Sequence, residues 1–148
     1  MVIDRFTITD YKEVYNLWIN TPGMGLNNID DSEEGIQKYL ERNPNTCFVA
    51  KENHRIIGVI LAGHDGRRGY IHHTAVDTNY RKQGIGKSLV AKSIEALKEE
   101  GIKKVAFVVF KKNQIGNIFW DKLGFTERED LVYRNKVISD KELERIDT

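Results

Sequence analysis

The 148-residue chain is poor in cysteine and proline and has no long apolar run. A single cysteine, Cys47, excludes a disulfide within the chain and is typical of proteins from a reducing compartment. Because Cys47 stands in an apolar run, we expect it to be buried as a small hydrophobic residue. No signal-peptide pattern and no run of about 20 apolar residues is present. We therefore expect a cytoplasmic protein with no membrane partner.

An excess of charge of one sign is also absent. The chain has 23 Lys and Arg against 22 Asp and Glu, which gives a net charge of +1. This balance argues against nucleic acid and acidic membranes as partners. The length fits one domain, residues 1–148. Metal-ligand spacing is missing as well, because His72 and His73 are neighbours in a strand and their side chains should diverge. We therefore expect no metal.

The most informative stretch that is present runs from residue 81 to 88, Arg-Lys-Gln-Gly-Ile-Gly-Lys-Ser. An apolar run at 70–76 precedes it and a helical run at 89–100 follows it. Glycines let a ligand approach the backbone, and the free N–H groups of a first helical turn favour an anion. Arg81, Lys82 and Lys87 add positive charge. The sequence therefore predicts a pyrophosphate site, with an ordinary helix cap as the alternative.

Two other phosphate loops are excluded by single residues. A Walker A loop ending in Gly-Lys-Ser needs glycine at position 81, which is Arg81. A dinucleotide fingerprint needs glycine at position 89, which is Leu89.

The Arg-x-x-Gly-x-Gly spacing instead resembles the pyrophosphate loop of the GNAT superfamily, the acyl-CoA-dependent N-acyltransferases. A second stretch, residues 113–125, resembles the other signature of that superfamily through Asn113, Gly116, Trp120 and Gly124-Phe125. The separation of the two motifs also fits. The resemblance covers at least residues 3–133, and the loop at 63–69 resembles a small bacterial, YpeA-like branch.

The order of the expected elements is similar to that of the GNAT fold, which implies an α/β (α+β) architecture with a mixed, mostly antiparallel sheet of six to seven strands flanked by about four helices. The resemblance further implies that the fourth and fifth strands splay apart and that the pantetheine arm lies between them. The expected strands are 2–6, 46–51, 55–62, 70–76, 104–110, 125–126 and 131–135. The expected helices begin near residues 10, 31, 89 and 114, with a short one near 139.

The resemblance implies an N-acetyltransferase that moves an acetyl group from acetyl-CoA to a primary amine of a small molecule or a protein. No Cys or Ser stands in a nucleophile context, so direct attack on the thioester is favoured. One alternative is a CoA-binding sensor or degenerate paralogue, because Trp120 stands where many relatives have Tyr. Another is a nucleotide-binding module. A homodimer also remains open.

The resemblance assigns two groups of residues to the cofactor. The backbone of 74–76 would pair with the pantetheine amides as an added strand, and the N–H of Val76 is a candidate oxyanion donor. Asn113 would bond the pantetheine arm or cap a helix. The full set is Thr74, Ala75, Val76, Arg81, Lys82, Gln83, Gly84, Ile85, Gly86, Lys87, Ser88, Asn113 and Trp120.

Three residues are candidates for proton handling. Strand alternation places residues 70, 72 and 74 on one face and 71, 73 and 75 on the other. His72 is the preferred proton acceptor because an imidazole titrates near neutral pH, and His73 is the second choice. Tyr133 is a candidate acid for the leaving thiolate. Trp120 can donate a hydrogen bond to sulfur but cannot act as an acid, and packing in the core is its alternative role.

The acceptor site should come from loops over the sheet. Asp65 could bind an ammonium group, whereas Arg67 and Arg68 could bind a carboxylate or phosphate. A solvated turn is the alternative for this loop. The candidate residues are Trp18, Met24, Asp65, Arg67 and Arg68.

Overall fold

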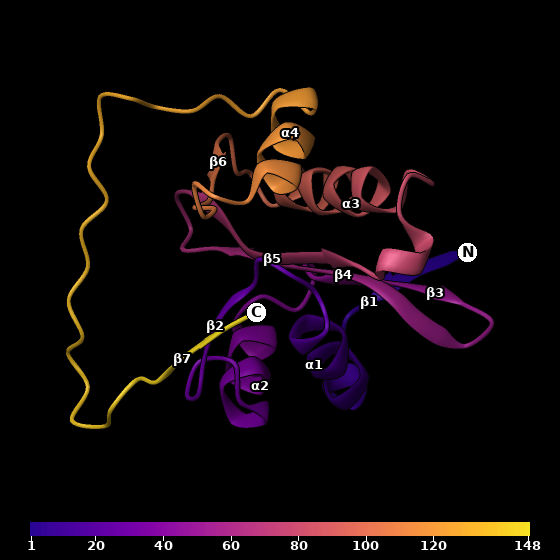
Figure 1. Cartoon of the computed structure of the whole chain (residues 1–148), viewed down its shortest axis with the longest axis horizontal. Helices are drawn as coiled ribbons and strands as arrows, with labels where there is room; N and C mark the ends of the chain where they lie inside the picture. Colours follow the sequence, from indigo (N-terminus) through magenta and orange to yellow (C-terminus); the bar gives the residue numbers. More distant parts are fainter.

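A five-stranded sheet with two helices on each face forms the centre of the molecule (Figure 1). A computed structural model describes the whole chain, Met1–Thr148. The strand order is β1-β3-β4-β5-β6, and only β5 and β6 are parallel. These strands are β1 (Val2–Arg5), β3 (Phe48–Glu52), β4 (Arg55–His64), β5 (Gly69–Val76) and β6 (Val105–Ala106). A separate two-stranded sheet consists of β2 (Gly25–Asn27) and β7 (Arg145–Asp147).

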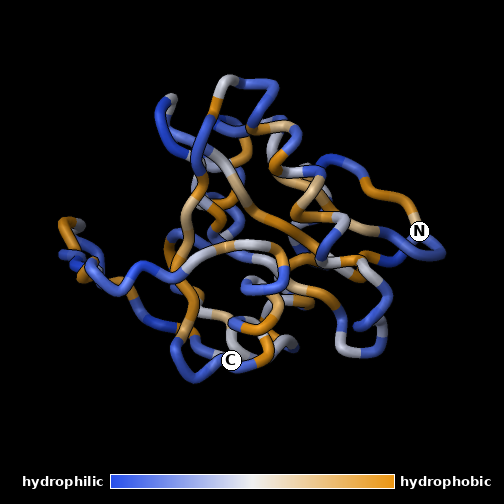
Figure 2. Tube along the Cα trace, turned by 90° about the horizontal axis from the view of Figure 1, so that it is seen from above, coloured by the Kyte–Doolittle hydropathy of each residue, from blue (hydrophilic) through white to orange (hydrophobic).

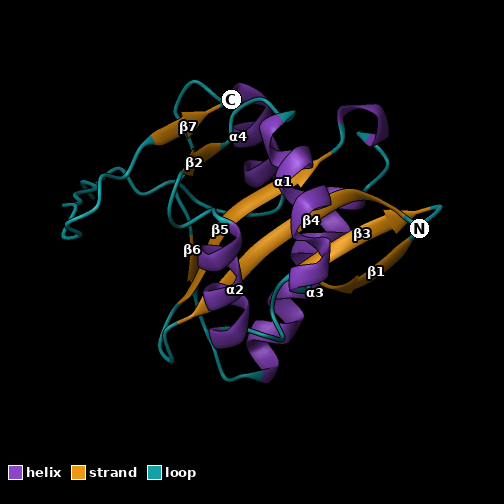
Figure 3. Cartoon of the chain, turned by 90° about the horizontal axis from the view of Figure 1, so that it is seen from below, coloured by secondary structure: helices purple, strands orange, loops and turns teal.

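Four helices cover the sheet in two pairs (Figures 1 and 3). They are α1 (Tyr11–Ile19), α2 (Glu33–Arg42), α3 (Ile85–Glu99) and α4 (Gln114–Lys122), and short 3-10 turns η1 (Ile8–Asp10) and η2 (Thr78–Tyr80) lie before α1 and α3. Local chemistry sets the helix starts: the Ser32 hydroxyl accepts the Gly35 N–H at 3.1 Å and so caps α2. No helix is both long enough and apolar enough to span a membrane.

The sheet separates two hydrophobic cores. Val14 and Trp18 of α1 and Ile36 of α2 pack on one face. Leu89 of α3 and Trp120 of α4 pack on the other. Figure 2 shows that the apolar stretches of the chain run through the middle of the molecule, whereas many of the outer turns are hydrophilic. Burial on both faces explains why β4 is apolar at nearly every position.

A β-bulge at His72 changes the alternation of side chains along β5. Leu61 of β4 pairs with His73 and Ala62 pairs with Ile71, so His72 is an extra residue without a partner in β4. A bulge shifts the face of every residue beyond it. Ile71 accordingly packs in the α3 core, whereas Ala75 packs in the α1 core. The prediction that residues 71, 73 and 75 share one face is therefore wrong.

Strands β5 and β6 separate after a short contact. Their ladder holds only Gly69 opposite Val105 and Tyr70 opposite Ala106. Beyond that point the β6 side of β5 has no strand partner up to Val76. The implied splay of these two strands is thus present in the structure.

The second half of the chain has fewer strands than the sequence predicts. The sheet has five strands rather than six or seven, and the strand expected at 104–110 is limited to Val105–Ala106 because β5 pairs with it only there. The segments 125–126 and 131–135 form no strand. Phe125 instead packs beside Trp120, and the apolar side chains of Leu131, Val132 and Tyr133 are exposed. In place of the helix near 139, Ser139 accepts the Lys141 N–H in a local turn that competes with helix formation.

Candidate functional site

The loop from Arg81 to Ser88 presents a helix start without a side-chain cap. Gly84 is the N-cap of α3, with φ of 79°, and the first backbone bond of the helix runs from the Ser88 N–H to the Gly84 carbonyl. The N–H groups of residues 85–87 precede that bond, so they have no partner within the helix. A Cβ at Gly84 would meet nothing within 4 Å. This open, uncapped turn fits the phosphates of a nucleotide-type cofactor.

The charged side chains of this loop take different roles. Lys82 and Lys87 are exposed next to the uncapped turn and add positive charge there. Arg81 is half-buried, and its Nε lies 3.5 Å from the Val76 carbonyl, which ties the loop to the end of β5. Gln83 is exposed, and the Ile85 side chain is buried in the core, so Ile85 offers only its backbone N–H.

The unpaired edge of β5 adjoins this loop. Residues 74–76 lie on the part of β5 beyond its pairing with β6. The hydroxyl of Thr74 is buried and has no hydrogen-bond partner, which is costly unless a ligand or water supplies one. A free strand edge and an unpartnered hydroxyl fit the amides of a pantetheine arm.

Helix α4 closes the other side of the splay. Asn113 caps it by accepting the Gly116 N–H at 2.9 Å. The side-chain amide of Asn113 also abuts the loop after α1, where a Cβ at Gly23 would lie 2.7 Å from Nδ2. A Cβ at Gly86 would lie 3.1 Å from the ring of Phe119, which shows how closely α3 and α4 approach. The two sequence motifs therefore meet in space.

Trp120 packs among aromatic side chains. Its ring centroid lies 4.3 Å from that of Phe107, 4.9 Å from that of Phe119 and 5.1 Å from that of Phe125. The side chain is 9% exposed. Packing within this aromatic cluster is thus a structural role for Trp120.

His72 lies between two tyrosine rings. Its ring centroid is 5.1 Å from Tyr39 of α2 and 4.7 Å from Tyr70 of β5, while one side of the residue stays open to solvent. Burial by these neighbours, together with the nearby His73, lowers the pKa of His72 below its ordinary value. The imidazole is therefore neutral at neutral pH and can accept a proton.

His73 is held in a buried pair. Its Nε2 lies 2.7 Å from Oδ1 of Asp31, and the two side chains are only 10% and 6% exposed. The other oxygen of Asp31 accepts the Asn27 N–H. Trp18 packs edge-on against the His73 ring at 4.9 Å. The bulge brings the rings of His72 and His73 to 6.5 Å on the same side of the sheet, contrary to the expected divergence.

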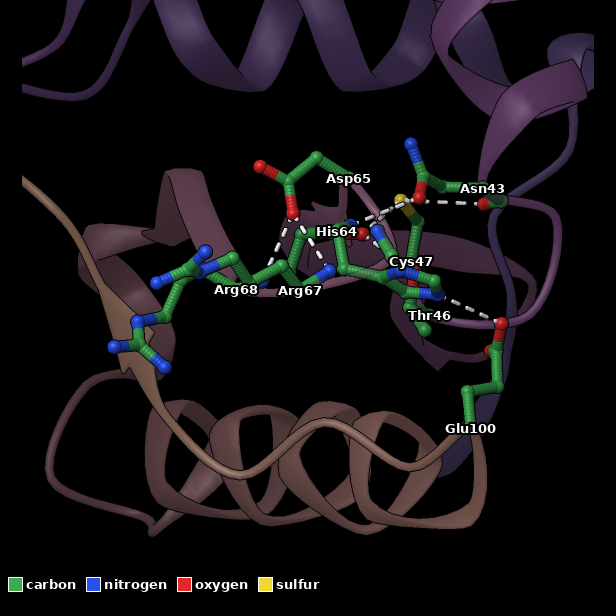
Figure 4. Close-up of polar contacts among 10 residues, drawn as sticks. Asn43, Thr46, Cys47, His64, Asp65, Arg67, Arg68 and Glu100 are labelled. Atoms are coloured by element: carbon green, nitrogen blue, oxygen red, sulfur yellow. Dashed lines mark hydrogen bonds and ion pairs between the residues drawn. The ribbon is translucent and has the colours of Figure 1, made fainter.

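The turn between β4 and β5 is fixed by hydrogen bonds (Figure 4). Oδ1 of Asp65 accepts the N–H groups of Arg67 and Arg68, both at 2.8 Å, and these bonds lower the pKa of Asp65. Nδ1 of His64 accepts the Gly66 N–H, so the proton is on Nε2, which donates to Glu100 at 3.0 Å. Figure 4 shows the guanidinium groups of Arg67 and Arg68 on the side of the turn away from Glu100.

Two of the predicted acceptor residues lie in the core. Trp18 and Met24 are 0% and 6% exposed, so neither presents its side chain to a ligand at the surface. The indole N–H of Trp18 has no hydrogen-bond partner. Tyr133 is 66% exposed, and the pKa of Tyr70 is raised by burial and by the proximity of Tyr133.

Comparison with known proteins decides the family. The model of the "Acetyltransferase (GNAT) family" matches residues 11–125. The chain belongs to this acetyltransferase family. The resemblance inferred from the sequence is thereby confirmed, and the protein is an acyltransferase. The YpeA-like branch stays a prediction.

Relatives of this acetyltransferase align with nearly its whole length. An acetyltransferase of Photorhabdus laumondii is 28% identical over 148 residues, with 96% of this chain and 99% of the relative covered. Among solved structures, the PaiA N-acetyltransferase of Thermoplasma acidophilum with coenzyme A has a TM-score of 0.72 at 17% identity, covering 84% of this chain and 89% of that one. An aminoglycoside acetyltransferase from an uncultured soil sample with sisomicin has a TM-score of 0.71 at 23% identity, covering 93% and 96%. These similarities confirm the fold.

A cleft of about 510 Å³ in this acetyltransferase opens beside His72. It contains His72, Asp65 and Arg68 but none of the other predicted acceptor residues. Sequence reasoning missed several lining residues, since Tyr39 fits an ordinary apolar stripe of α2 and isolated cations carry no motif. The missed residues include Tyr39, Arg42, His64, Lys104 and Arg128. A second cleft, of about 360 Å³ between α1 and η2, contains no predicted site residue.

Proposed function

We propose that this acetyltransferase moves an acetyl group from acetyl-CoA to the primary amine of a small molecule, by direct attack on the thioester. The observation that carries the proposal is the unpaired edge of β5 next to the uncapped start of α3. Solved relatives of the same fold were crystallised with coenzyme A and with sisomicin. A protein amino group is the other acceptor that the activity allows.

Acetyl-CoA would supply an activated acetyl group as a thioester. The N–H groups of residues 85–87 would bind its pyrophosphate, with Lys82 and Lys87 nearby as cations. The backbone of 74–76 would pair with the pantetheine amides. Asn113 already caps α4 through its oxygen, so its amide nitrogen is the atom left to contact the cofactor.

His72 would accept the proton that the amine must lose before attack. A neutral imidazole suits that role, and the lowered pKa keeps His72 neutral at physiological pH. His73 is less suited because its Nε2 is engaged by Asp31. Tyr133 remains a candidate to protonate the thiolate, and Trp120 a candidate to contact the sulfur from its aromatic cluster.

We also propose a cytoplasmic setting, which the single free cysteine, Cys47, supports. The Cys47 thiol lies 3.0 Å from the Ala62 carbonyl, and burial raises its pKa to about 12. It is therefore not a nucleophile at neutral pH.

The first test is thermal unfolding with acetyl-CoA, CoA, ATP and NAD. A ligand at 100 times its dissociation constant stabilises the folded state by about 2.7 kcal/mol. We expect a shift with the two CoA species alone, followed by thiol release when a suitable amine is added. Stabilisation by ATP or NAD instead would refute the cofactor assignment. CoA binding without thiol release for any amine would indicate a CoA sensor, which the packed Trp120 would then explain.

A further inference from the structure

The cleft beside His72 combines an aromatic wall with a basic rim. Tyr39 and Tyr70 flank the His72 ring at 5.1 and 4.7 Å and form the wall. Four separate segments supply the cations of the rim: the last turn of α2, the β4–β5 turn, the connection from α3 to β6, and the chain after α4. The cations are Arg42, Arg68, Lys104 and Arg128.

Three of these cations have no partner in the protein. Arg42, Arg68 and Lys104 have no carboxylate within 4 Å, whereas Arg128 forms two bonds of 2.8 Å with Asp130. Unpaired cations gathered around one cleft raise the local concentration of anions. Arginine in particular matches the planar geometry of a carboxylate or the oxygens of a phosphate.

The carboxylates that line the cleft are fewer than its cations. Asp65 is the only acidic residue in the lining, and its Oδ1 accepts two backbone N–H groups of its own turn. Asp31 is paired with His73, and Glu100 accepts from His64. A polycationic acceptor such as an aminoglycoside would therefore meet three unpaired cations here and a single exposed carboxylate, that of Asp65.

We propose that the acceptor of this enzyme is an amine that carries an anionic group, a carboxylate or a phosphate, bound against Arg42 and Arg68. An apolar or aromatic part of the acceptor packs on Tyr39 and Tyr70, and its amine faces His72. The inference rests on the proposed acetyl transfer and names the class of amine that the cleft admits.

Matched pairs of amines test the inference with the full chain. Thiol release from acetyl-CoA is measured with phenylalanine against phenylalaninamide, with phosphoethanolamine against ethanolamine, and with spermidine and kanamycin. We expect the anionic member of at least one pair to have a kcat/KM about tenfold or more above its neutral partner. The pair that responds distinguishes a carboxylate from a phosphate acceptor.

Side-chain truncations locate the effect. Arg68→Ala removes the guanidinium but keeps the N–H that Asp65 binds, so the turn is retained. We expect it to raise KM for the anionic amine about tenfold, with a smaller effect on the neutral partner. Lys104→Ala should act in the same direction. Lys103→Ala is the matched control, because Lys103 is exposed next to Lys104 but does not line the cleft.

The outcomes separate the two proposals. A kcat/KM for neutral or polycationic amines equal to or above that of the anionic ones overturns the inference and leaves acetyl transfer intact. Equal effects of Arg68→Ala and the control Lys103→Ala on KM for the anionic amine also overturn it. If none of the tested amines causes thiol release, the proposed function and the inference are both overturned. The thermal shift with CoA then shows whether the chain still binds the cofactor.

Discussion

Replacing Gly84 by aspartate should weaken the binding of CoA without lowering the stability of the fold. Gly84 caps α3 with φ of 79°, and nothing lies within 4 Å of the position that a Cβ would take. Gly84→Asp places a negative charge beside the uncapped N–H groups, where the pyrophosphate should bind. Gly84→Asn has the same shape and the same backbone strain without the charge. The difference between the two variants therefore reports the charge alone.

The magnitude follows from Coulomb's law. Two unit charges 4 Å apart repel by about 1 kcal/mol in water and about 4 kcal/mol at an effective dielectric of 20. The dissociation constant for CoA should thus be roughly 5- to 1000-fold higher for Gly84→Asp than for Gly84→Asn. The fold should respond in the opposite direction, since a carboxylate at a helix start stabilises the helix by about 0.3–1 kcal/mol.

Calorimetric titration with CoA, at low and high ionic strength, measures the first effect, and thermal unfolding without ligand measures the second. Salt should narrow the difference in CoA affinity because it screens exposed charges. Gly101→Asp is the control: Gly101 has φ of 82° and equally open surroundings, but lies beyond the other end of α3. Equal CoA affinity of the Gly84→Asp and Gly84→Asn variants would refute the pyrophosphate site. So would an equal loss of affinity in the control.

Four further outcomes are expected. In the parent enzyme, kcat/KM should fall only below pH ~6.5, because His72 has a lowered pKa and becomes protonated only at lower pH. His72→Gln should remove this fall at low pH, and an unchanged pH profile would exclude His72 as the base. Trp120→Ala should lower the free energy of unfolding by about 3–5 kcal/mol in urea titrations, and Trp120→Phe by clearly less. Asp31→Asn should lower the free energy of unfolding by about 1–3 kcal/mol, whereas the exposed Asp30→Asn should lower it by less than about 0.5 kcal/mol. Equal values for the two variants would contradict the buried pair of Asp31 and His73. Cys47 should react with a thiol reagent only after unfolding, so rapid labelling of the native protein would contradict its burial.

Local signals predicted the parts of the fold that depend on neighbouring residues. The loop at 81–88 and α3 follow from glycines and helical spacing, and α4 follows from Asn113, which caps it as the sequence suggested. The splay of β5 and β6 followed from family resemblance rather than from periodicity.

Features that depend on pairing between distant segments were not predictable. The bulge arises from the register of β5 on β4, and alternation within β5 alone gives no sign of it. The cleft likewise joins Tyr39 and Arg42 of α2 to Lys104, which lie far apart in the sequence. The pairing of β7 with β2 was not predictable for the same reason: it places Asn27 opposite Arg145, and these residues are far apart in the sequence.

The bulge at His72 also acts as a spacer that keeps the two halves of β5 out of phase. Deletion of this one residue would leave Leu61 opposite His73 and Ala62 opposite Ile71, so both halves of the strand would keep their present faces in a regular ladder. Ile71 would stay in the α3 core, whereas the imidazole beside Tyr39 and Tyr70 would be lost. The bulge therefore lets β5 carry one extra side chain at the cleft while the packing on both faces of the sheet is kept.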